Sequence, residues 1–312
     1  RQMCIRDRTR NLQGSVPSYT TAPVSEWLGS HVYAALGIPV HETVLGIRDG
    51  RIVCACRDFT FPDSRLVNFH DLKNSLSDDE PGFTEDASTG SGVVLADVRS
   101  AIHRIPVLRS IDGVSDRFWD MFVVDAFIRN IDRNNTNWGV LRNPRGEFSL
   151  APVYGNGNSF NNKRTESGIE RRLANPDLIR QDALDVRSCY VTDRGKPIAP
   201  LKYLASGQDE ECTKALDRFM ERYDPRSFHD LLDSIPSMSH GLTVVPDGFH
   251  EYHRRVCDYR YEHAFMEAWR ELHPTVGFPS SPEASVPEPL PDPDPSVLPS
   301  SSVPTCFDGP GM

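Results

Sequence analysis

The sequence predicts a mixed α/β (α+β) fold of two lobes, a small N-terminal lobe and a larger, mainly helical one. Two β-favouring runs in residues 41–59 are joined by an Asp-Gly step, a strong hairpin signal. Residues 75–92 are acidic and lack apolar periodicity, whereas residues 176–273 mostly show helical spacing. We expect a division into residues 1–59, a mainly helical large part over 60–273 and a tail over 274–312.

The small lobe is expected to begin with an amphipathic helix over residues 23–36, because its apolar side chains recur at helical spacing. Ser25, near the start of that helix, is available as its cap. The runs HETVLGI and RIVCACRDF follow, and the turn Arg48-Asp49-Gly50 between them predicts a β-hairpin. A helix and a hairpin thus open the fold.

The centre of the chain should hold a buried helix followed by two polar loops. Residues 75–92 are interpreted as a mobile surface loop, and residues 93–103 and 118–130 as helices. The second of these, FWDMFVVDAFIRN, is apolar nearly all round, as a buried central helix would be. It leads into IDRNNTNWG. The strands WGVLR and FSLAPV, joined by Asn-Pro-Arg-Gly, should then form a hairpin that ends at the polar loop YGNGNSF.

The last part of the chain divides into helices and a proline-rich tail. After residue 273, 11 of the 25 prolines fall within the final 39 residues, mixed with serine and acidic side chains. Such a composition cannot build a core, so residues 274–312 are predicted to be disordered.

Charge and cysteine usage narrow the function classes. With 34 basic and 44 acidic residues, the net charge of −10 argues against direct nucleic-acid binding and against an anionic-membrane binder. Seven scattered cysteines without a C-x-x-C pair fit a reduced, cytoplasmic setting. No run of 18 apolar residues and no secretory signal is present. Because the sequence begins with arginine, we expect its true N-terminus to be missing.

Asp132 and Asn137 form the pattern that carries chemistry. A loop aspartate can accept a hydroxyl proton, and an asparagine five positions on can hold a magnesium ion that bridges phosphates. The hairpin then returns the chain, so that the second loop can present another metal ligand beside the first. The spacing alone is also typical of an ordinary Asx-rich turn, and only the flanking buried helix and hairpin favour phosphoryl transfer.

The segments FWDMFVVDAFIRNIDRNNTNWGVL and LAPVYGNGNSF resemble the catalytic and metal-binding segments of the HipA-like kinases, bacterial serine/threonine kinases that include toxin components. The resemblance extends to SEWLGSHVYAALGIPVHETVLG, to CRDF and to the helical region through DYRY. It implies a two-lobed protein-kinase-like fold with a truncated small lobe. It also implies ATP and Mg²⁺ as cofactors, a protein serine or threonine as substrate, and an antitoxin partner.

By the same resemblance, Asp132 is the expected catalytic base and Asn137 a magnesium ligand. Glu26 would pair with a phosphate-binding lysine, although a solvent-facing helical carboxylate is an equally good interpretation of it. A hinge segment is expected near the adenine, formed by Cys56, Arg57, Asp58 and Phe59.

The sequence departs from the family pattern at the second metal ligand. The family has Tyr-Asp-Asn-Gly, but this chain has Gly155 in place of the aspartate, so a carboxylate is lost. Asn156 or Asn158 could supply a neutral oxygen, and a weakened magnesium site is expected. These residues favour the alternative of a pseudokinase, a nucleotide-binding or protein-interaction module without turnover.

Other departures concern the phosphate site and the catalytic loop. The first lysine is Lys73, so the lysine and glycine-rich loop expected before Glu26 are absent from the sequence. Asn134 replaces a histidine of the family, and Arg129 stands where a small residue is common. A small-molecule phosphotransferase of the aminoglycoside type shares the Asp and Asn arrangement and remains the other alternative.

Overall fold

The computed structural model describes residues 3–7, 21–60, 62–77 and 92–275. Contacts group the chain into two compact units, Arg1–Ser281 and Pro282–Met312, and every described residue belongs to the first. Most of the predicted acidic loop and nearly all of the predicted proline-rich tail lie outside the described residues. The proposed division at residue 59 stays a prediction.

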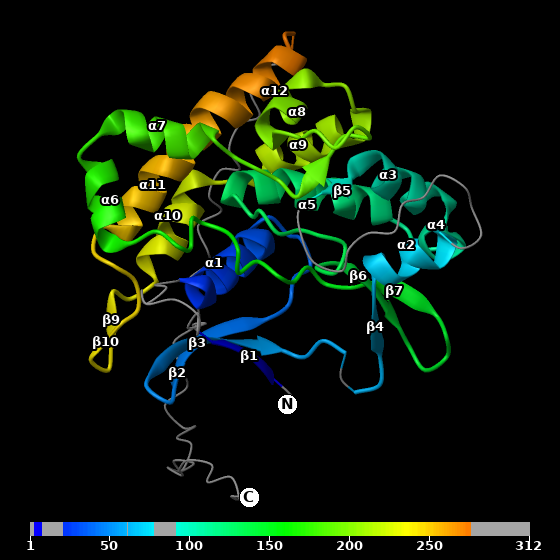
Figure 1. The fold of residues 1–312 in the computed structure, drawn as a ribbon, viewed down its shortest axis with the longest axis horizontal. Coiled ribbons are helices and arrows are strands. Elements are labelled where there is room, and N and C mark those ends of the chain that lie inside the picture. Colours follow the sequence, from blue (N-terminus) through cyan, green and yellow to red (C-terminus); the bar gives the residue numbers. More distant parts are fainter. Residues whose placement is uncertain (1–2, 8–20, 61, 78–91, 276–312) are drawn as a thin grey trace, which may run out of the picture. The chain divides into compact units, whose positions relative to one another are not determined.

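The first sheet consists of three antiparallel strands in the order β1-β3-β2 (Figure 1). The strands are β1 (Met3–Asp7), β2 (Thr43–Arg48) and β3 (Arg51–Arg57). The predicted hairpin is confirmed, since Arg48 pairs with Arg51 across a two-residue turn. Asp49 and Gly50 have φ of 51° and 68°, the left-handed pair that a tight hairpin needs.

Helix α1 (Ala22–Ala35) packs on β2 and β3 and confirms the predicted first helix. The prediction that Ser25 caps it is wrong. The helix begins at Ala22 with Pro23 in its first turn, which places Ser25 inside it. The buried Ser25 hydroxyl instead donates to the Ser159 carbonyl at 3.1 Å and so ties α1 to the second polar loop.

A second sheet, in the order β4-β6-β7, contains the other predicted hairpin. Its strands are β4 (Arg65–Asn68), β6 (Gly139–Arg142) and β7 (Phe148–Leu150). A Cβ at Gly139 would stand 2.2 Å from the Val67 carbonyl oxygen, so only glycine allows β4 and β6 to approach this closely. Helix α2 (Phe69–Ser77) follows β4, and the loop predicted from residue 75 therefore begins too early.

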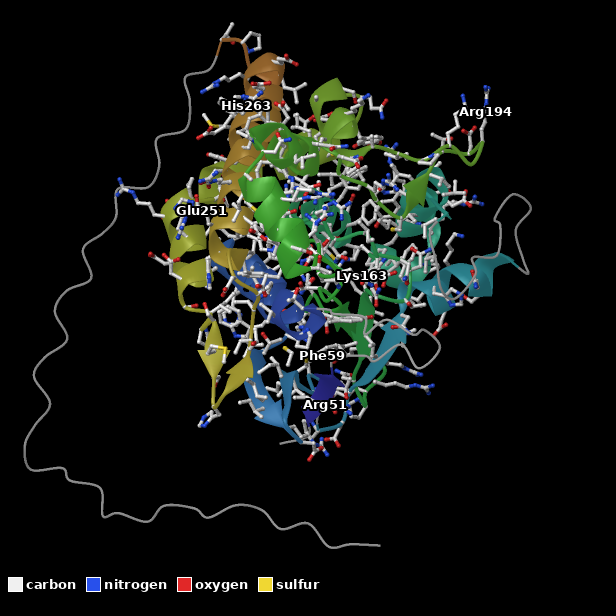
Figure 2. The ribbon with its side chains drawn as sticks, turned by 60° about the vertical axis from the view of Figure 1, so that its left-hand side comes forward. Arg51, Phe59, Lys163, Arg194, Glu251 and His263 are labelled. Atoms are coloured by element: carbon white, nitrogen blue, oxygen red, sulfur yellow. The ribbon has the colours of Figure 1, made fainter. Side chains whose placement is uncertain are left out.

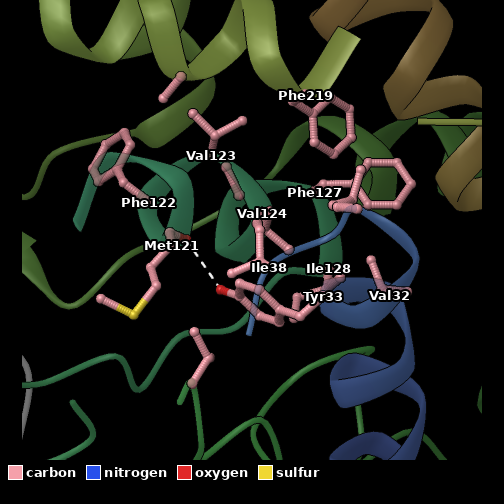
Figure 3. Close-up of a cluster of buried hydrophobic side chains, with 14 of the residues drawn as sticks. Val32, Tyr33, Ile38, Met121, Phe122, Val123, Val124, Phe127, Ile128 and Phe219 are labelled. Atoms are coloured by element: carbon pink, nitrogen blue, oxygen red, sulfur yellow. Dashed lines mark hydrogen bonds between the residues drawn. The ribbon is translucent and has the colours of Figure 1, made fainter. Parts of the chain in front are cut away.

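Helix α5 (Val114–Ile128) forms the centre of the core, as its apolar composition predicts. In Figure 3 its side chains, among them Val124 and Phe127, lie between Tyr33 and Phe219, which come from helices on either side of it. The Tyr33 hydroxyl of α1 reaches α5 and donates to the Met121 carbonyl at 3.3 Å. The helix ends at Arg129, whose φ of 57° turns the chain sharply into the first polar loop.

The remaining helices surround α5 and confirm a mainly helical second half (Figure 1). The predicted helix over residues 93–103 is shorter than expected, because Val93–Val94 forms a strand, β5, that pairs with β8 (Tyr190–Val191). No described helix is long and apolar enough to cross a membrane. The other elements are α3 (Leu95–Arg104), α4 (Pro106–Arg109), α6 (Glu166–Leu173), α7 (Pro176–Leu184), α8 (Pro200–Ser206), α9 (Glu210–Arg222), α10 (Pro225–Asp233), β9 (Met238–Ser239), β10 (Leu242–Thr243), α11 (Phe249–Arg260), the π-helical turn η1 (Tyr261–Phe265) and α12 (Met266–Leu272).

Candidate active site

The Asp132 carboxylate is held by side chains from both polar loops. The Asn134 amide donates to Oδ1 at 2.8 Å, and the Asn158 amide donates to Oδ2 at 2.9 Å. The Asp132 backbone N–H donates to Asn130 Oδ1 at 3.2 Å. These contacts fix the orientation of a half-buried carboxylate in the first loop, and they explain the asparagines around it.

Asn137 lies against both loops. Its amide donates to the Asp132 carbonyl, and a Cβ built on Gly155 would stand 3.0 Å from Asn137 Oδ1. The structure therefore brings together Asn137 and the position at which the family pattern has its second carboxylate. Gly155 has a φ of +78°, a conformation that side chains rarely adopt, so an aspartate here would require a backbone adjustment.

Glu26 faces the second loop and is fully buried. Its Oε1 accepts from the backbone N–H groups of Gly155 and Asn156 at 3.2 and 3.0 Å, and from His41 Nε2 at 3.0 Å. The solvent-facing interpretation of Glu26 is wrong. Pairing with a phosphate-binding lysine stays a prediction, and in the described residues the basic side chain beside this oxygen is that of His41.

Arg133 and Ser30 hold the Asn156 side chain. This side chain is fully buried, its Oδ1 accepts from Arg133 Nη2 at 2.6 Å, and its Nδ2 donates to Ser30 Oγ at 3.1 Å. The Arg133 guanidinium therefore already donates to Asn156 Oδ1, the oxygen that would be a magnesium ligand. The role of Asn156 as a metal ligand stays a prediction that would require this contact to open.

Arg133 joins the first polar loop, the second polar loop and α5 into one network. Its Nε and Nη2 donate to the two oxygens of Asp125, at 2.8 and 3.1 Å, and its Nη1 donates to the carbonyls of Asn137 and Tyr154. Together with the bond to Asn156, all five N–H groups have acceptors. Burial opposes the charge, but Asp125 outweighs it and raises the pKa of Arg133 above its usual range.

The predicted hinge segment comes close to the second loop at one residue. The Phe59 ring lies 5.5 Å from the Tyr154 ring and 6.4 Å from His41. Asp58 accepts from the Thr60 backbone N–H at 2.9 Å and turns the chain after β3. Cys56 is buried in β3, and Arg57 pairs with Glu42 at the surface. An adenine site at this segment stays a prediction.

Sequence reasoning missed Asp125, Arg133 and His41. Asp125 is a carboxylate within a helix that is apolar nearly all round, and a buried charge there needs a partner. That signal was available from the sequence, because Arg133 follows eight residues later. The contact between His41 and Glu26 could not be found in this way, since it depends on how β2 packs on α1.

A buried helix that leads into an aspartate and an asparagine, with a second polar loop held against them by a hairpin, defines a protein-kinase-like phosphotransferase fold. No family model matches the chain. The serine/threonine-protein kinase CtkA of Helicobacter pylori strain J99 is 33% identical over 224 residues, which make up 71% of this chain and 66% of CtkA. The chain belongs with CtkA to the HipA-like serine/threonine kinases.

A solved structure of CtkA agrees with this assignment. The crystal structure of a Helicobacter pylori proinflammatory kinase CtkA has a TM-score of 0.75 at 27% identity, over 87% of this chain and 91% of that one. A chain from the Shewanella oneidensis MR-1 complex of HipA, HipB and operator DNA has a TM-score of 0.44 at 12% identity, over 80% of this chain and 58% of that one. The second likeness is too distant to support a functional point.

Proposed function

We propose that this protein transfers the γ-phosphoryl group of ATP to a serine or threonine hydroxyl of another protein. The observation that carries the proposal is the Asp132 carboxylate, which two asparagine amides orient beside Asn137. The similarity to a serine/threonine-protein kinase supports the same reaction. The substrate protein is expected to meet it in the cytoplasm, and an antitoxin partner stays a prediction.

Asp132 would act by orienting the acceptor hydroxyl and taking its proton. Each oxygen of the carboxylate accepts one amide N–H and retains a lone pair for a hydroxyl. The hydroxyl oxygen forms a new bond to the γ-phosphorus while the bond to ADP breaks, and the proton passes to Asp132. Because the protein mainly positions the reactants, the two amide contacts are part of the catalytic geometry.

The residues beside Asp132 fit a magnesium ion that is held mainly by the nucleotide. Asn137 Oδ1 is a hard oxygen ligand of the kind Mg²⁺ accepts, and Mg²⁺ commonly takes one or two protein ligands, water and phosphate oxygens. When bound, the ion would neutralise charge on the phosphates. Asn137 would hold the ion. Gly155 lies beside Asn137 but offers no carboxylate to the ion.

A pseudokinase is the second candidate, and Gly155 favours it. The left-handed backbone and the contact with Asn137 adapt this loop to a glycine. A pseudokinase would bind nucleotide or a protein partner in the same place, without turnover.

Radiolabel transfer from ATP separates these two functions. The natural chain should label a protein substrate or itself, Asp132→Asn should not, and both should show the same circular dichroism. If only Gly155→Asp is active, the pseudokinase is correct. Labelling that survives in Asp132→Asn would remove Asp132 as the base.

A further inference from the structure

A group of basic side chains surrounds Asp182, outside the network of Arg133. Arg164 Nη2 donates to the Asp182 oxygens at 3.0 and 2.9 Å, Arg172 Nε donates to Oδ2, and the Tyr252 hydroxyl donates to Oδ2 at 2.6 Å. Arg260 lies buried behind them and donates to the backbone carbonyls of Asp182 and Ala183 at 2.9 and 2.7 Å. We call Arg129, Arg164, Arg172 and Arg260 the arginine cluster.

The arginine cluster has an excess of positive charge. Its four guanidinium groups lie near two carboxylates, those of Asp182 and Asp185, and these six groups together have a net charge of about +2 at neutral pH. Burial, and after it the positive charge of Arg260, lower the pKa of the neighbouring His253 to about 3. In a chain with a net charge of −10, such a local excess is suited to an anion.

Two members of the cluster have N–H groups to offer. Within the part of the chain that the structure describes, Arg164 Nε is buried and has no hydrogen-bond partner. The Arg129 side chain makes one hydrogen bond to described residues, from Nε to the Asp185 carbonyl at 3.4 Å. Arg129 is partly exposed and 27% of the Arg164 side chain is accessible, but Arg164 Nε itself is buried, so a ligand from solution can reach the Arg129 side chain and the outer N–H groups of Arg164.

The cluster lies beside the candidate active site. Arg129 precedes Asp132 by three residues, which limits their Cα separation to about 10 Å. Arg164 belongs to the segment that follows the second loop, since its N–H donates to the Asn161 carbonyl at 2.8 Å. The same segment begins at Asn158, whose amide holds Asp132. In a bound peptide, a group that contacts the arginine cluster would therefore lie only a few residues along the peptide from the serine or threonine whose hydroxyl accepts the phosphate.

We propose that the arginine cluster binds the phosphate of a phosphoserine or phosphothreonine that lies near the acceptor residue in the peptide substrate. A phosphate monoester carries about −1.5 to −2 charges at pH 7, which matches the excess of the cluster, and its oxygens suit the forked donors of arginine. The protein would thus prefer peptides that have already been phosphorylated. This inference deepens the proposed function and rests on it for the identity of the ligand as a substrate.

The test measures peptide binding without ATP, by fluorescence anisotropy on the full chain. The probes are a labelled peptide with a phosphoserine three positions from a second serine, its unphosphorylated form, and a form with glutamate at that position. The phosphopeptide should bind about tenfold or more tightly than either, because hydrogen bonds between charged groups contribute at least that much. Equal affinity for the three peptides would overturn the proposal.

The decisive variant is Arg129→Gln. The Arg129 side chain makes one long hydrogen bond to described residues, so its replacement should leave the fold intact. It should reduce the preference for the phosphopeptide about tenfold. Arg194→Gln removes the same charge from a turn that lies far from Lys163 and α6 in Figure 2, and it should leave the preference unchanged. A preference that survives Arg129→Gln refutes the proposal. A natural chain that binds the phosphopeptide but transfers no phosphate would instead refute the proposed function.

Discussion

Replacement of Arg133 by methionine should destabilise the protein by about 3–5 kcal/mol, the range for breaking a buried ion pair by removing one partner. The guanidinium is 1% exposed and makes all five of its hydrogen bonds inside the protein. Methionine fills a similar volume, so the loss of unfolding free energy comes from the missing hydrogen bonds and ion pair of Arg133. Asp125, 6% exposed, would remain buried and, among the described residues, would keep the Tyr33 hydroxyl and the Asn130 amide as partners, at 2.8 and 3.1 Å.

Urea unfolding followed by circular dichroism measures this loss. With a slope of about 1–3 kcal/mol per molar urea, the midpoint should fall by about 1 M or more at an unchanged slope. The double variant Asp125→Asn with Arg133→Met is the control, because it removes both buried charges and should be more stable than Arg133→Met alone. If Arg133→Met lies within about 1 kcal/mol of the natural chain, the network does not hold the loops as argued.

Three further predictions concern the base, the second loop and a buried histidine. Asp132→Asn should lower phosphoryl transfer by about 10²-fold or more and leave the thermal midpoint unchanged; comparable rates would contradict its role as a base. Gly155→Asp should cost about 1–2 kcal/mol in a thermal melt, because of its φ of +78° and the contact with Asn137, and a melt equal to that of the natural chain would show that the loop adapts freely. Burial lowers the pKa of His253 to about 3, so below its usual value of about 6.5 the unfolded state binds the extra proton. Stability should therefore fall as the pH falls from about 6.5 to 3, by up to about 1.4 kcal/mol per pH unit, and His253→Phe should remove that part of the slope in urea unfolding; identical slopes would disprove it.

Local signals in the sequence determined much of the fold. The Asp49-Gly50 turn, the apolar run of α5 and the hairpin of β6 and β7 each depend on short-range chemistry, and each is confirmed. The prediction for Ser25 was wrong because the helix begins earlier, with Pro23 in its first turn, so that Ser25 lies inside the helix. The strand at Val93–Val94 was missed because its partner, β8, lies almost a hundred residues away.

The site was predictable only in outline. The spacing of Asp132 and Asn137 indicated two loops that meet, and the structure brings them together. Which side chains hold those loops depends on long-range packing: Glu26 reaches the second loop across 130 positions of the chain, at the Asn156 N–H. No pattern in a single sequence specifies such a contact.

The position of Arg133 limits how the protein can open. One side chain fastens the carbonyls of Asn137 and Tyr154 to the same helix, so the two loops cannot separate from each other without giving up buried hydrogen bonds. The first polar loop, the second polar loop and α5 would therefore move together as one unit.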